Sequence, residues 1–170
     1  MSDPHVCQIR STTDSDGAAA CLLDWGPVRA LLAPPVVLAT ARDLAAAAAA
    51  AELDVAMVQA LQEDLGADDQ MLGLLVTMVR SRRPLPTTRA ALRIEPIAGA
   101  RTGQPYVHIG RGSMKGELSP DEAREMANVW TQVAVAAHID VRLRHALRQW
   151  DRPDAGELEE LFTLIQQEGP

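Results

Sequence analysis

Lysine and aromatic residues are scarce in this chain. Among its 170 residues, Lys115 is the single lysine beside 15 arginines, and five side chains are aromatic. Alanine, in contrast, occurs 28 times. A composition rich in alanine, with arginine favoured over lysine, is typical of GC-rich coding DNA, so we expect an actinobacterial or actinophage origin. With so few aromatic rings, the core must be built mainly from aliphatic side chains.

Cysteine is nearly absent as well. Cys7 and Cys21 alone exclude a disulfide framework and a four-cysteine zinc site. No uninterrupted apolar run reaches the ~18 residues of a membrane span, and Met1–His5 lacks the basic and apolar segments of a signal peptide. These absences predict a cytoplasmic protein without membrane contact, in which both thiols stay reduced.

Hydrophobic residues make up 47% of the chain and charged residues 23%, which is the balance of a globular protein. We predict a single α+β domain over residues 1–170, dominated by helices. It should contain two antiparallel β-hairpins with four to five helices packed on one side. The first hairpin, at 5–25, is expected to be loosely attached.

The N-terminal hairpin is predicted from two extended runs within residues 6–25 and the turn-forming cluster Ser11–Gly17. A pairing centred on Asp14 would place Cys7 opposite Cys21, on the same face of the hairpin. The two thiols would then be neighbours across the strands.

A second hairpin is predicted at 91–110, with a register that sets Ile94 against Val107. Its apolar side chains would share one face, and a one-residue slip would mix the two faces. The opposite face would carry Arg93, Glu95, Tyr106 and His108. The glycine-rich segment 109–116 lies between a strand and a helix, a context that can bind phosphate. It matches no phosphate-binding motif, so it is interpreted as a flexible connector or a general anion or partner contact.

Proline and glycine predict the limits of the first helices. Pro27 should open a short helix through Leu32. A long helix should follow, from Val36 or Ala41 to Leu65, capped by Thr40 and ended by Gly66.

The segment 69–81 follows an aspartate cap and is apolar almost all round, so we expect a central buried helix. Leu75 illustrates the consequence, because its truncation should then leave a costly cavity. The residues expected to be nearly fully buried are Leu72, Leu75, Val79, Val55, Val58, Trp130 and Val133.

The strongest local signal is Ser119–Glu122, in which Ser119 and Glu122 form a capping box around Pro120. The helix that starts there should run to about Trp150. The stretch 118–127 is similar to the strand–loop–helix ends of many small actinobacterial and actinophage proteins, but it mostly encodes a helix cap and implies no function. A terminal helix should follow, capped by Asp154, with Leu158, Leu161, Phe162 and Ile165 as its packing face.

Charge is unevenly distributed along the chain. Residues 76–115 carry a net charge of +7, whereas residues 1–75 carry −8 and residues 116–170 carry −6. A basic segment inside an acidic chain needs either internal carboxylates or an external partner. The candidate partner- or anion-binding residues are Arg82, Arg83, Arg93, Arg101, His108, Arg111 and Lys115.

These features favour a non-enzymatic interaction or regulatory protein that binds a protein partner or forms a homodimer, using the long helices 41–65 and 119–150. A first alternative is a nucleic-acid-associated accessory protein that uses residues 80–115, although its pI of about 5 disfavours this role. A second alternative is a small enzyme that uses Glu95 and His108 as an acid–base pair. The sequence suggests no cofactor, and its histidines lack the spacing of a metal site.

Overall fold

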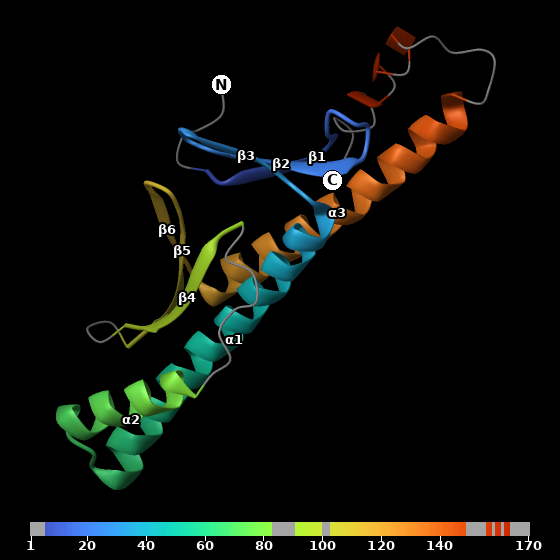
Figure 1. Ribbon diagram of the computed structural model, residues 1–170. Helices are drawn as coiled ribbons and strands as arrows, with labels where there is room; N and C mark the ends of the chain where they lie inside the picture. The colour runs from blue at the N-terminus through green and yellow to red at the C-terminus, as the bar shows by residue number, and fades with distance from the viewer. Residues whose placement is uncertain are drawn as a thin grey trace. The chain divides into compact units, whose positions relative to one another are not determined.

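The computed structural model describes residues 6–82, 91–99 and 103–148, together with six residues between 156 and 163. The α+β class is confirmed, but each predicted hairpin is a three-stranded antiparallel sheet (Figure 1). The described residues form three helical elements, α1 to α3, where four to five helices were predicted. The elements are β1 (Gln8–Thr13), β2 (Ala19–Trp25), β3 (Val28–Leu32), α1 (Pro34–Leu65), α2 (Asp69–Ser81), β4 (Arg93–Ala98), β5 (Pro105–Arg111), β6 (Met114–Leu118) and α3 (Pro120–Arg148).

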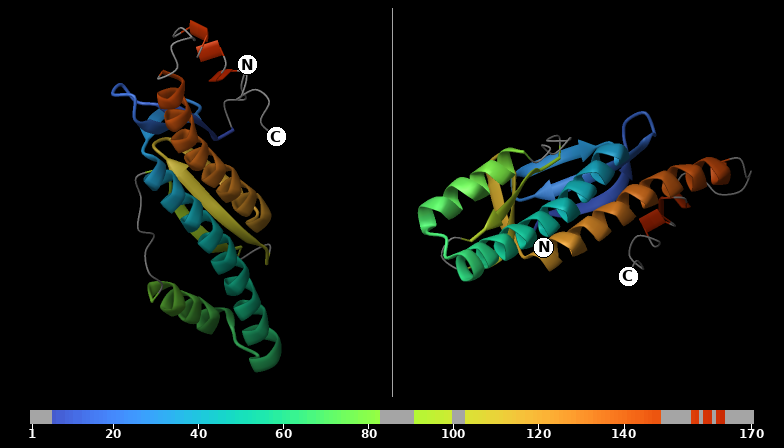
Figure 2. Two further views of the ribbon diagram at one scale, coloured as in Figure 1. Left: turned by 90° about the vertical axis from the view of Figure 1, so that its right-hand side faces the viewer. Right: turned by 90° about the horizontal axis from the view of Figure 1, so that it is seen from below.

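The chain forms two compact units. Unit 1 contains residues up to Pro35 and from Gln132 onward, and so combines sheet A (β1-β2-β3) with the second part of α3. Unit 2 spans Val36–Thr131 and contains most of α1, all of α2, sheet B (β4-β5-β6) and the first part of α3. Within unit 2, sheet B lies along α1 and α3, and α2 folds back from the end of α1 (Figure 2).

The predicted register of the first hairpin is wrong. Ser11, not Cys7, lies opposite Cys21, and four residues along a strand correspond to about 13 Å. Both cysteines are free, and this separation excludes a disulfide without backbone movement. The turn is displaced because the Asp14 carboxylate accepts hydrogen bonds from the amides of Asp16 and Ala18, which makes Asp14 the start of the turn and not its centre.

The predicted short helix at 27–32 is strand β3. Gly26 has a φ of +57°, so Gly26 and Pro27 form a tight turn between the paired residues Trp25 and Val28. Pro27 therefore occupies a turn position instead of the first turn of a helix. Leu32 is buried and the preceding Leu31 is exposed, which is the alternation of a strand with one covered face.

Sheet B also differs from its prediction. Ile94 pairs with Ile109 and not with Val107, and this two-residue slip keeps the same side chains on the same faces. The segment expected to be a connector contains β6, which pairs with β5 through a turn at Gly112, whose φ is +57°. Gly112 therefore marks a hairpin turn rather than a loose loop.

The limits of the first two helices are partly as predicted. Gly66, with a φ of +60°, ends α1, and Asp68 caps α2 by accepting a hydrogen bond of 2.8 Å from the amide of Met71. Helix α1, however, begins at Pro34. Thr40 is no cap, because it is buried inside α1 and its hydroxyl donates to the Val36 carbonyl.

Helix α2 is not the central helix. Leu72 is its buried residue, whereas Met71, Leu74 and Met78 are 53%, 64% and 49% exposed. Of the predicted core, Leu72 and Trp130 are buried; the other five residues, Leu75, Val79, Val55, Val58 and Val133, are half-buried. The core of unit 2 instead joins α1, α3 and sheet B through Val37, Leu44, Ala48, Leu92, Val107, Ala123 and Trp130.

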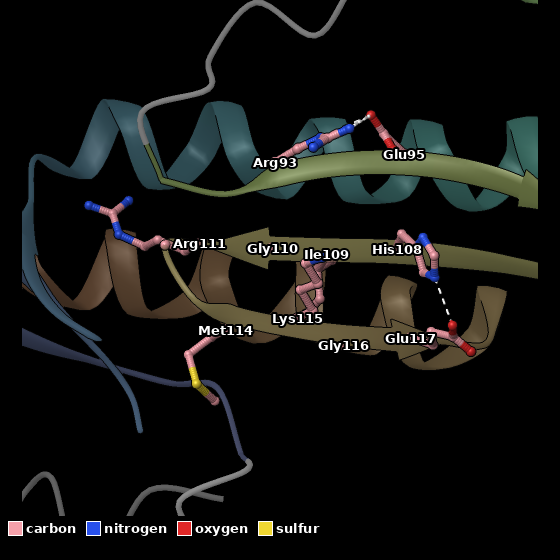
Figure 3. Close-up of a pocket in the computed structure, with 11 residues that line it drawn as sticks. Arg93, Glu95, His108, Ile109, Gly110, Arg111, Met114, Lys115, Gly116 and Glu117 are labelled. Carbon is pink, nitrogen blue, oxygen red and sulfur yellow. Dashed lines mark hydrogen bonds and ion pairs between the residues drawn. The ribbon is translucent and has the colours of Figure 1, made fainter. Parts of the chain in front are cut away.

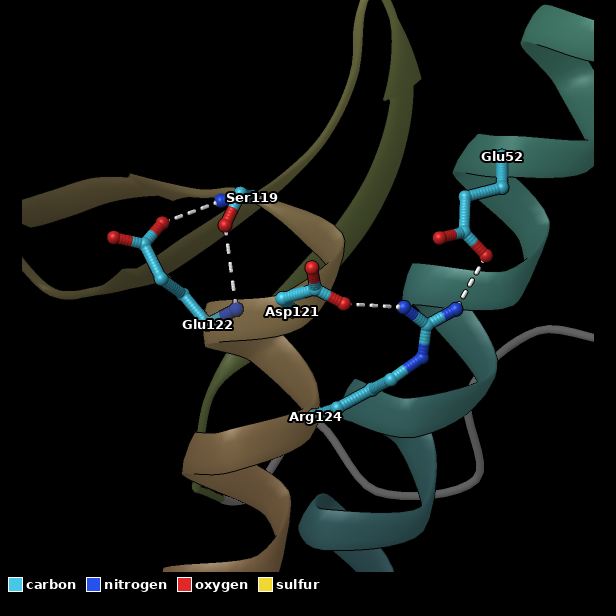
Figure 4. A network of polar contacts seen from close by, with 5 residues as sticks. All are labelled: Glu52, Ser119, Asp121, Glu122 and Arg124. Atoms are coloured by element: carbon cyan, nitrogen blue, oxygen red, sulfur yellow. Dashed lines mark hydrogen bonds and ion pairs between the residues drawn. The ribbon is translucent and has the colours of Figure 1, made fainter.

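The capping box of α3 is confirmed. The amide of Ser119 donates to the Glu122 carboxylate at 2.7 Å, and the amide of Glu122 donates to the Ser119 hydroxyl at 3.3 Å. Arg124 follows, and its guanidinium donates to Asp121 and to Glu52 of α1 (Figure 4). The hydrogen bond that Arg124 donates to Glu52 raises the pKa of Arg124, so this end of α3 is held to α1 by charge.

Of the residues predicted to pack in the terminal helix, Phe162 lies within the described part of the chain. Phe162 is buried, and the guanidinium carbon of Arg144 lies 4.1 Å from its ring centroid. Arg144 also pairs with Glu159. The predicted cap Asp154 and the residues Leu158, Leu161 and Ile165 lie outside the described residues.

The chain contains an internal repeat that no single local motif reveals. Residues 17–81 (the first repeat) align with 103–167 (the second repeat) without a gap, at a constant offset of 86, and 16 of the 65 positions are identical. The identical pairs are Gly17/Gly103, Gly26/Gly112, Leu32/Leu118, Pro34/Pro120, Ala41/Ala127, Ala48/Ala134, Ala50/Ala136, Ala51/Ala137, Asp54/Asp140, Val55/Val141, Ala60/Ala146, Leu61/Leu147, Asp68/Asp154, Leu72/Leu158, Leu75/Leu161 and Thr77/Thr163.

Local structure repeats at the same offset. The β5–β6 register is the β2–β3 register shifted by 86, as in the pairs Cys21–Leu32 and Val107–Leu118. Gly17, Gly26, Gly103 and Gly112 all have positive φ at the corresponding turns. The repeat is therefore one of structure as well as sequence, with two strands and a long helix in each copy, and β1 and β4 precede the repeats.

The helices carry the repeat as well. Asp54 and Asp140 are the two buried acids among the described residues. The hydroxyls of Thr77 and Thr163 each donate to the carbonyl four residues earlier, at 2.8 Å or less. Because equivalent positions share an environment, any difference between the two repeats can be compared position by position.

Helix α1 is long and apolar enough to cross a membrane by length and composition, with a mean hydropathy of 1.5 over its most apolar stretch. Of that stretch, 28% is buried inside the structure. Buried helices of water-soluble proteins meet the same criterion.

Candidate functional site

A groove lies on the face of sheet B opposite its core face (Figure 3). Two rows of side chains cross its three strands. Arg93, Gly110 and Lys115 form one row, and Glu95, His108 and Glu117 form the other. Successive residues on one face of a strand are ~7 Å apart, so a row of cations lies beside a row of carboxylates and imidazole.

Gly110 accounts for the hollow in the cationic row. Without a side chain there, the space between Arg93 and Lys115 stays open. The equivalent position in the first repeat is Asp24, which instead pairs with Arg29 at 3.6 Å. The hollow is therefore a feature of the second repeat and not of the repeated fold.

Most charges in the groove already have partners. Arg93 lies 2.6 Å from Glu95, and His108 Nε2 lies 2.7 Å from Glu117 (Figure 3). Arg111 donates to the Ala91 carbonyl. Lys115 is exposed and has no charged partner within the described part of the chain, so it is the cation most available to a ligand.

The groove brings together four of the seven candidate residues from the sequence: Arg93, His108, Arg111 and Lys115. Arg82 lies elsewhere, at the end of α2. Arg83 and Arg101 lie outside the described residues.

Sequence reasoning missed Glu117 as a member of this surface, because strand β6 was not predicted. The pairing of β5 with β6 places its carboxylate against His108. The signal was the alternation of Lys115 and Glu117 with Met114, Gly116 and Leu118, since alternation of period two is typical of a strand.

The groove offers little for catalysis. His108 and Glu117 form an acid–base pair, but no serine, threonine or cysteine is among the residues that line it. Glu95 is held by Arg93. No group of three or more metal-ligating side chains occurs among residues 6–82, 91–99 and 103–148 or the described terminal ones.

A second surface differs from a normal solvent face. The outward face of α2, defined by Met71, Leu74 and Met78, exposes about half or more of each side chain. In the second repeat the equivalents of Met71 and Leu74 are Glu157 and Glu160, which are exposed. Two positions of this face are thus apolar in the first repeat and acidic in the second, whereas the third, Met78, corresponds to Leu164.

Comparison of the chain with protein-family models, with curated proteins and with solved structures finds no match.

Proposed function

We propose that this protein is a non-enzymatic interaction protein that binds another protein molecule through the outward face of α2. The observation that supports this role is the contrast between Met71 and Leu74 and their second-repeat equivalents Glu157 and Glu160. The two glutamates show that a charged side chain is accepted at these positions when they face water. An apolar ridge at the same position costs solubility unless a partner covers it.

The geometry of the ridge suits recognition by a helix or groove. Met71, Leu74 and Met78 are spaced three and four residues apart, which places them on one stripe of α2. Full burial of a Leu or Met side chain contributes ~1.5–3 kcal/mol, so covering the exposed halves of three side chains supplies a few kcal/mol. That is enough to hold a partner when other contacts contribute.

Site-specific photo-crosslinking tests this role. A photoreactive amino acid at position 74 should give protein–protein adducts in cells, whereas the same residue at position 160, the second-repeat equivalent, should give none. Adducts at 160 alone, or at neither position, would show that the face of α2 is not a protein-binding surface.

The groove on sheet B supports a second candidate function, the binding of an anionic segment. Lys115 and the hollow at Gly110 are the specific observations, because together they offer a free cation beside open space. Tyr106 alone among the described residues of this face offers a phenol ring for base stacking, so we favour an acidic peptide over a nucleic acid as the ligand.

A binding titration with a labelled acidic peptide tests the groove. Lys115→Ala should weaken binding, and Arg29→Ala, at the equivalent position of the first repeat, should not. Binding should also weaken as salt rises. If a single-stranded oligonucleotide binds more tightly than the peptide, the nucleic-acid role replaces this one; equal loss in both variants would show that the groove is not involved.

A further inference from the structure

We infer that the anionic segment bound by sheet B is an extended peptide that adds as a fourth strand along the outer edge of β6. This inference rests on the second candidate function, the groove on sheet B, and gives its mode of binding. The observations that carry it are the unused backbone groups of β6, a proline on the opposite edge of the sheet and the charge of Lys115.

The outer edge of β6 has backbone groups that the sheet does not use. Arg111 and Met114 pair across a two-residue turn, so they form a hydrogen-bonded pair, and from there every second residue of β6 bonds to β5. The backbone N–H and C=O groups of Lys115 and Glu117 therefore point away from β5. In the described part of the chain β6 is an edge strand, and no hydrogen bond reaches these groups. Such groups can pair with one more strand.

The opposite edge of sheet B is closed to strand addition. The residues of β5 that bond to β6 alternate with those that bond to β4. His108 is therefore bonded to its partner Glu95, and the backbone of the next residue, Pro96, points outward. Proline has no N–H to donate, and it is confined to edges for that reason. A new strand can therefore add at β6 and not at β4.

The charges along β6 determine which peptide fits. Lys115 and Glu117 are exposed on the groove face, and a residue paired with either one has its side chain on that same face. Glu117 already contacts His108 (Figure 3), whereas Lys115 has no charged partner among the described residues. Opposite charges stabilise a cross-strand pair and like charges destabilise it. The peptide should therefore carry an acidic residue opposite Lys115 and none opposite Glu117.

The other face of β6 is apolar. Met114 and Leu118 are half-buried, and Gly116 between them has no side chain. Because successive residues of a strand alternate between faces, the two peptide residues that flank the acid lie beside this apolar edge. The partner that fits is therefore an extended segment in which an acidic residue stands between two aliphatic residues.

The first repeat offers a matched comparison. Strand β3 has the same arrangement, because Trp25 and Val28 pair across a two-residue turn, and its outward backbone groups belong to Arg29 and Leu31. Arg29, the equivalent of Lys115, lies 3.6 Å from Asp24. The edge of β3 therefore lacks a cation without a partner, and we expect the acidic strand at β6 alone.

Backbone methylation of the ligand tests strand addition separately from charge. The probe is the labelled hexapeptide Thr-Arg-Val-Glu-Val-Thr, which sets its glutamate opposite Lys115 and its arginine opposite Glu117 when it binds antiparallel. The amide of that glutamate then donates to the Lys115 carbonyl, whereas the valine amides point away from β6. N-methylation of the glutamate should raise the dissociation constant at least about fivefold, and N-methylation of the preceding valine should change it by less than about twofold.

Proline substitution tests the same contact from the side of the protein. Glu117→Pro removes an outward N–H that β5 does not use, so it should bind the probe more weakly than Glu117→Ala, which keeps the N–H. Leu31→Pro, at the equivalent position of β3, should bind like the wild type, and circular dichroism should show that each variant is folded. In the wild type, the amides of Lys115 and Glu117 should exchange hydrogen more slowly when the probe is bound.

Each other outcome overturns strand addition in a distinguishable way. Equal effects of the two methylations, with binding that still depends on Lys115, would leave the groove as an acidic-peptide site but exclude a fourth strand. Failure of the probe to bind also overturns strand addition, while the groove function is decided by its own titration. If light scattering shows a dimer that Glu117→Pro abolishes, the added strand belongs to a second copy and not to a separate peptide.

Discussion

The Asp54 carboxylate on α1 is almost fully buried and lies 3.1 Å from Nε of Arg80 on α2. This ion pair connects α2, which carries the apolar face, to α1, whose buried residues contribute to the core of unit 2. Leu72 is the buried apolar residue of α2, so this ion pair contributes to the orientation of α2.

Replacing Arg80 with Ala should lower the free energy of unfolding by ~1–3 kcal/mol, because the buried carboxylate loses its charged donor. The partial exposure of Arg80 keeps the effect below that of a fully buried pair. Urea denaturation measures it, with Arg82→Ala as the control, for which the change should stay within about 0.5 kcal/mol. Equal effects of the two variants would show that the pair contributes nothing.

Truncation of two leucines should change the free energy of unfolding by very different amounts. Leu44→Ala, in the core of unit 2, should cost ~2–5 kcal/mol because its side chain is fully buried and leaves a cavity. Leu74→Ala should change the stability of the monomer by less than about 0.5 kcal/mol. Thermal unfolding under dilute conditions compares them. A costly Leu74→Ala would mean that its face is covered within the chain itself.

The two cysteines should differ in reactivity. Burial raises the pKa of the Cys21 thiol to about 11, so almost no thiolate exists there at pH 8, and the thiolate is the reactive form. Alkylation of the folded protein should therefore modify Cys7 alone, and unfolding should release the second thiol. In Cys7→Ser protein, any fast reaction before unfolding would contradict this assignment.

The capping box of α3 should make stability depend on pH. The backbone amide of Ser119, and then its hydroxyl, lower the pKa of Glu122 below its usual 4.5. A carboxyl with a lowered pKa stabilises the folded state above its unfolded pKa, and this contribution disappears as the pH falls through the folded pKa. Glu122→Gln should therefore be less stable than the wild type near pH 7.

The stability difference between Glu122→Gln and the wild type should shrink toward zero in acid. Ser119→Ala should cost ~1 kcal/mol as an N-cap loss. Glu125→Gln, on the same exposed stretch, is the matched control and should follow the wild type at every pH. A gap that stays constant from pH 7 into acid would exclude a titrating capping contact.

Signals carried by a few adjacent residues predicted local structure well. Asp68, Gly66 and the Ser119–Glu122 box mark helix ends in the sequence, and each marks one in the structure. Such signals succeed because their hydrogen bonds close within one helical turn.

Signals that depend on distant partners predicted less. Strands β3 and β6 were missed because Pro27 and the glycines around Ser113 suggested a helix start and a loose loop, whereas both sites are tight turns. The apolar pattern of α2 suggested burial, but whether an apolar helix is covered depends on what packs against it. No local pattern contains that information.

Only some residues of the candidate groove were predicted, for the same reason. Arg93, His108 and Lys115 were chosen because of the basic segment, yet only the pairing of three strands places them in two rows with Glu117. The repeat could be found from sequence only by comparing the chain with itself at an offset of 86, because its identities are single residues or adjacent pairs, such as Asp54/Asp140 with Val55/Val141.

The pairing of each strand with a near neighbour in the chain has a consequence for how the protein folds. Among the paired strand residues, Arg93 and Gly110 are the farthest apart in sequence. The strands of each sheet can therefore pair without a segment from the other end of the chain. Such short-range contacts close quickly. The strands of sheet B, whose unit lies within Val36–Thr131, should therefore be protected early in pulsed hydrogen exchange during refolding. Sheet A packs in a unit that also contains residues from Gln132 onward, so its strands should be protected later.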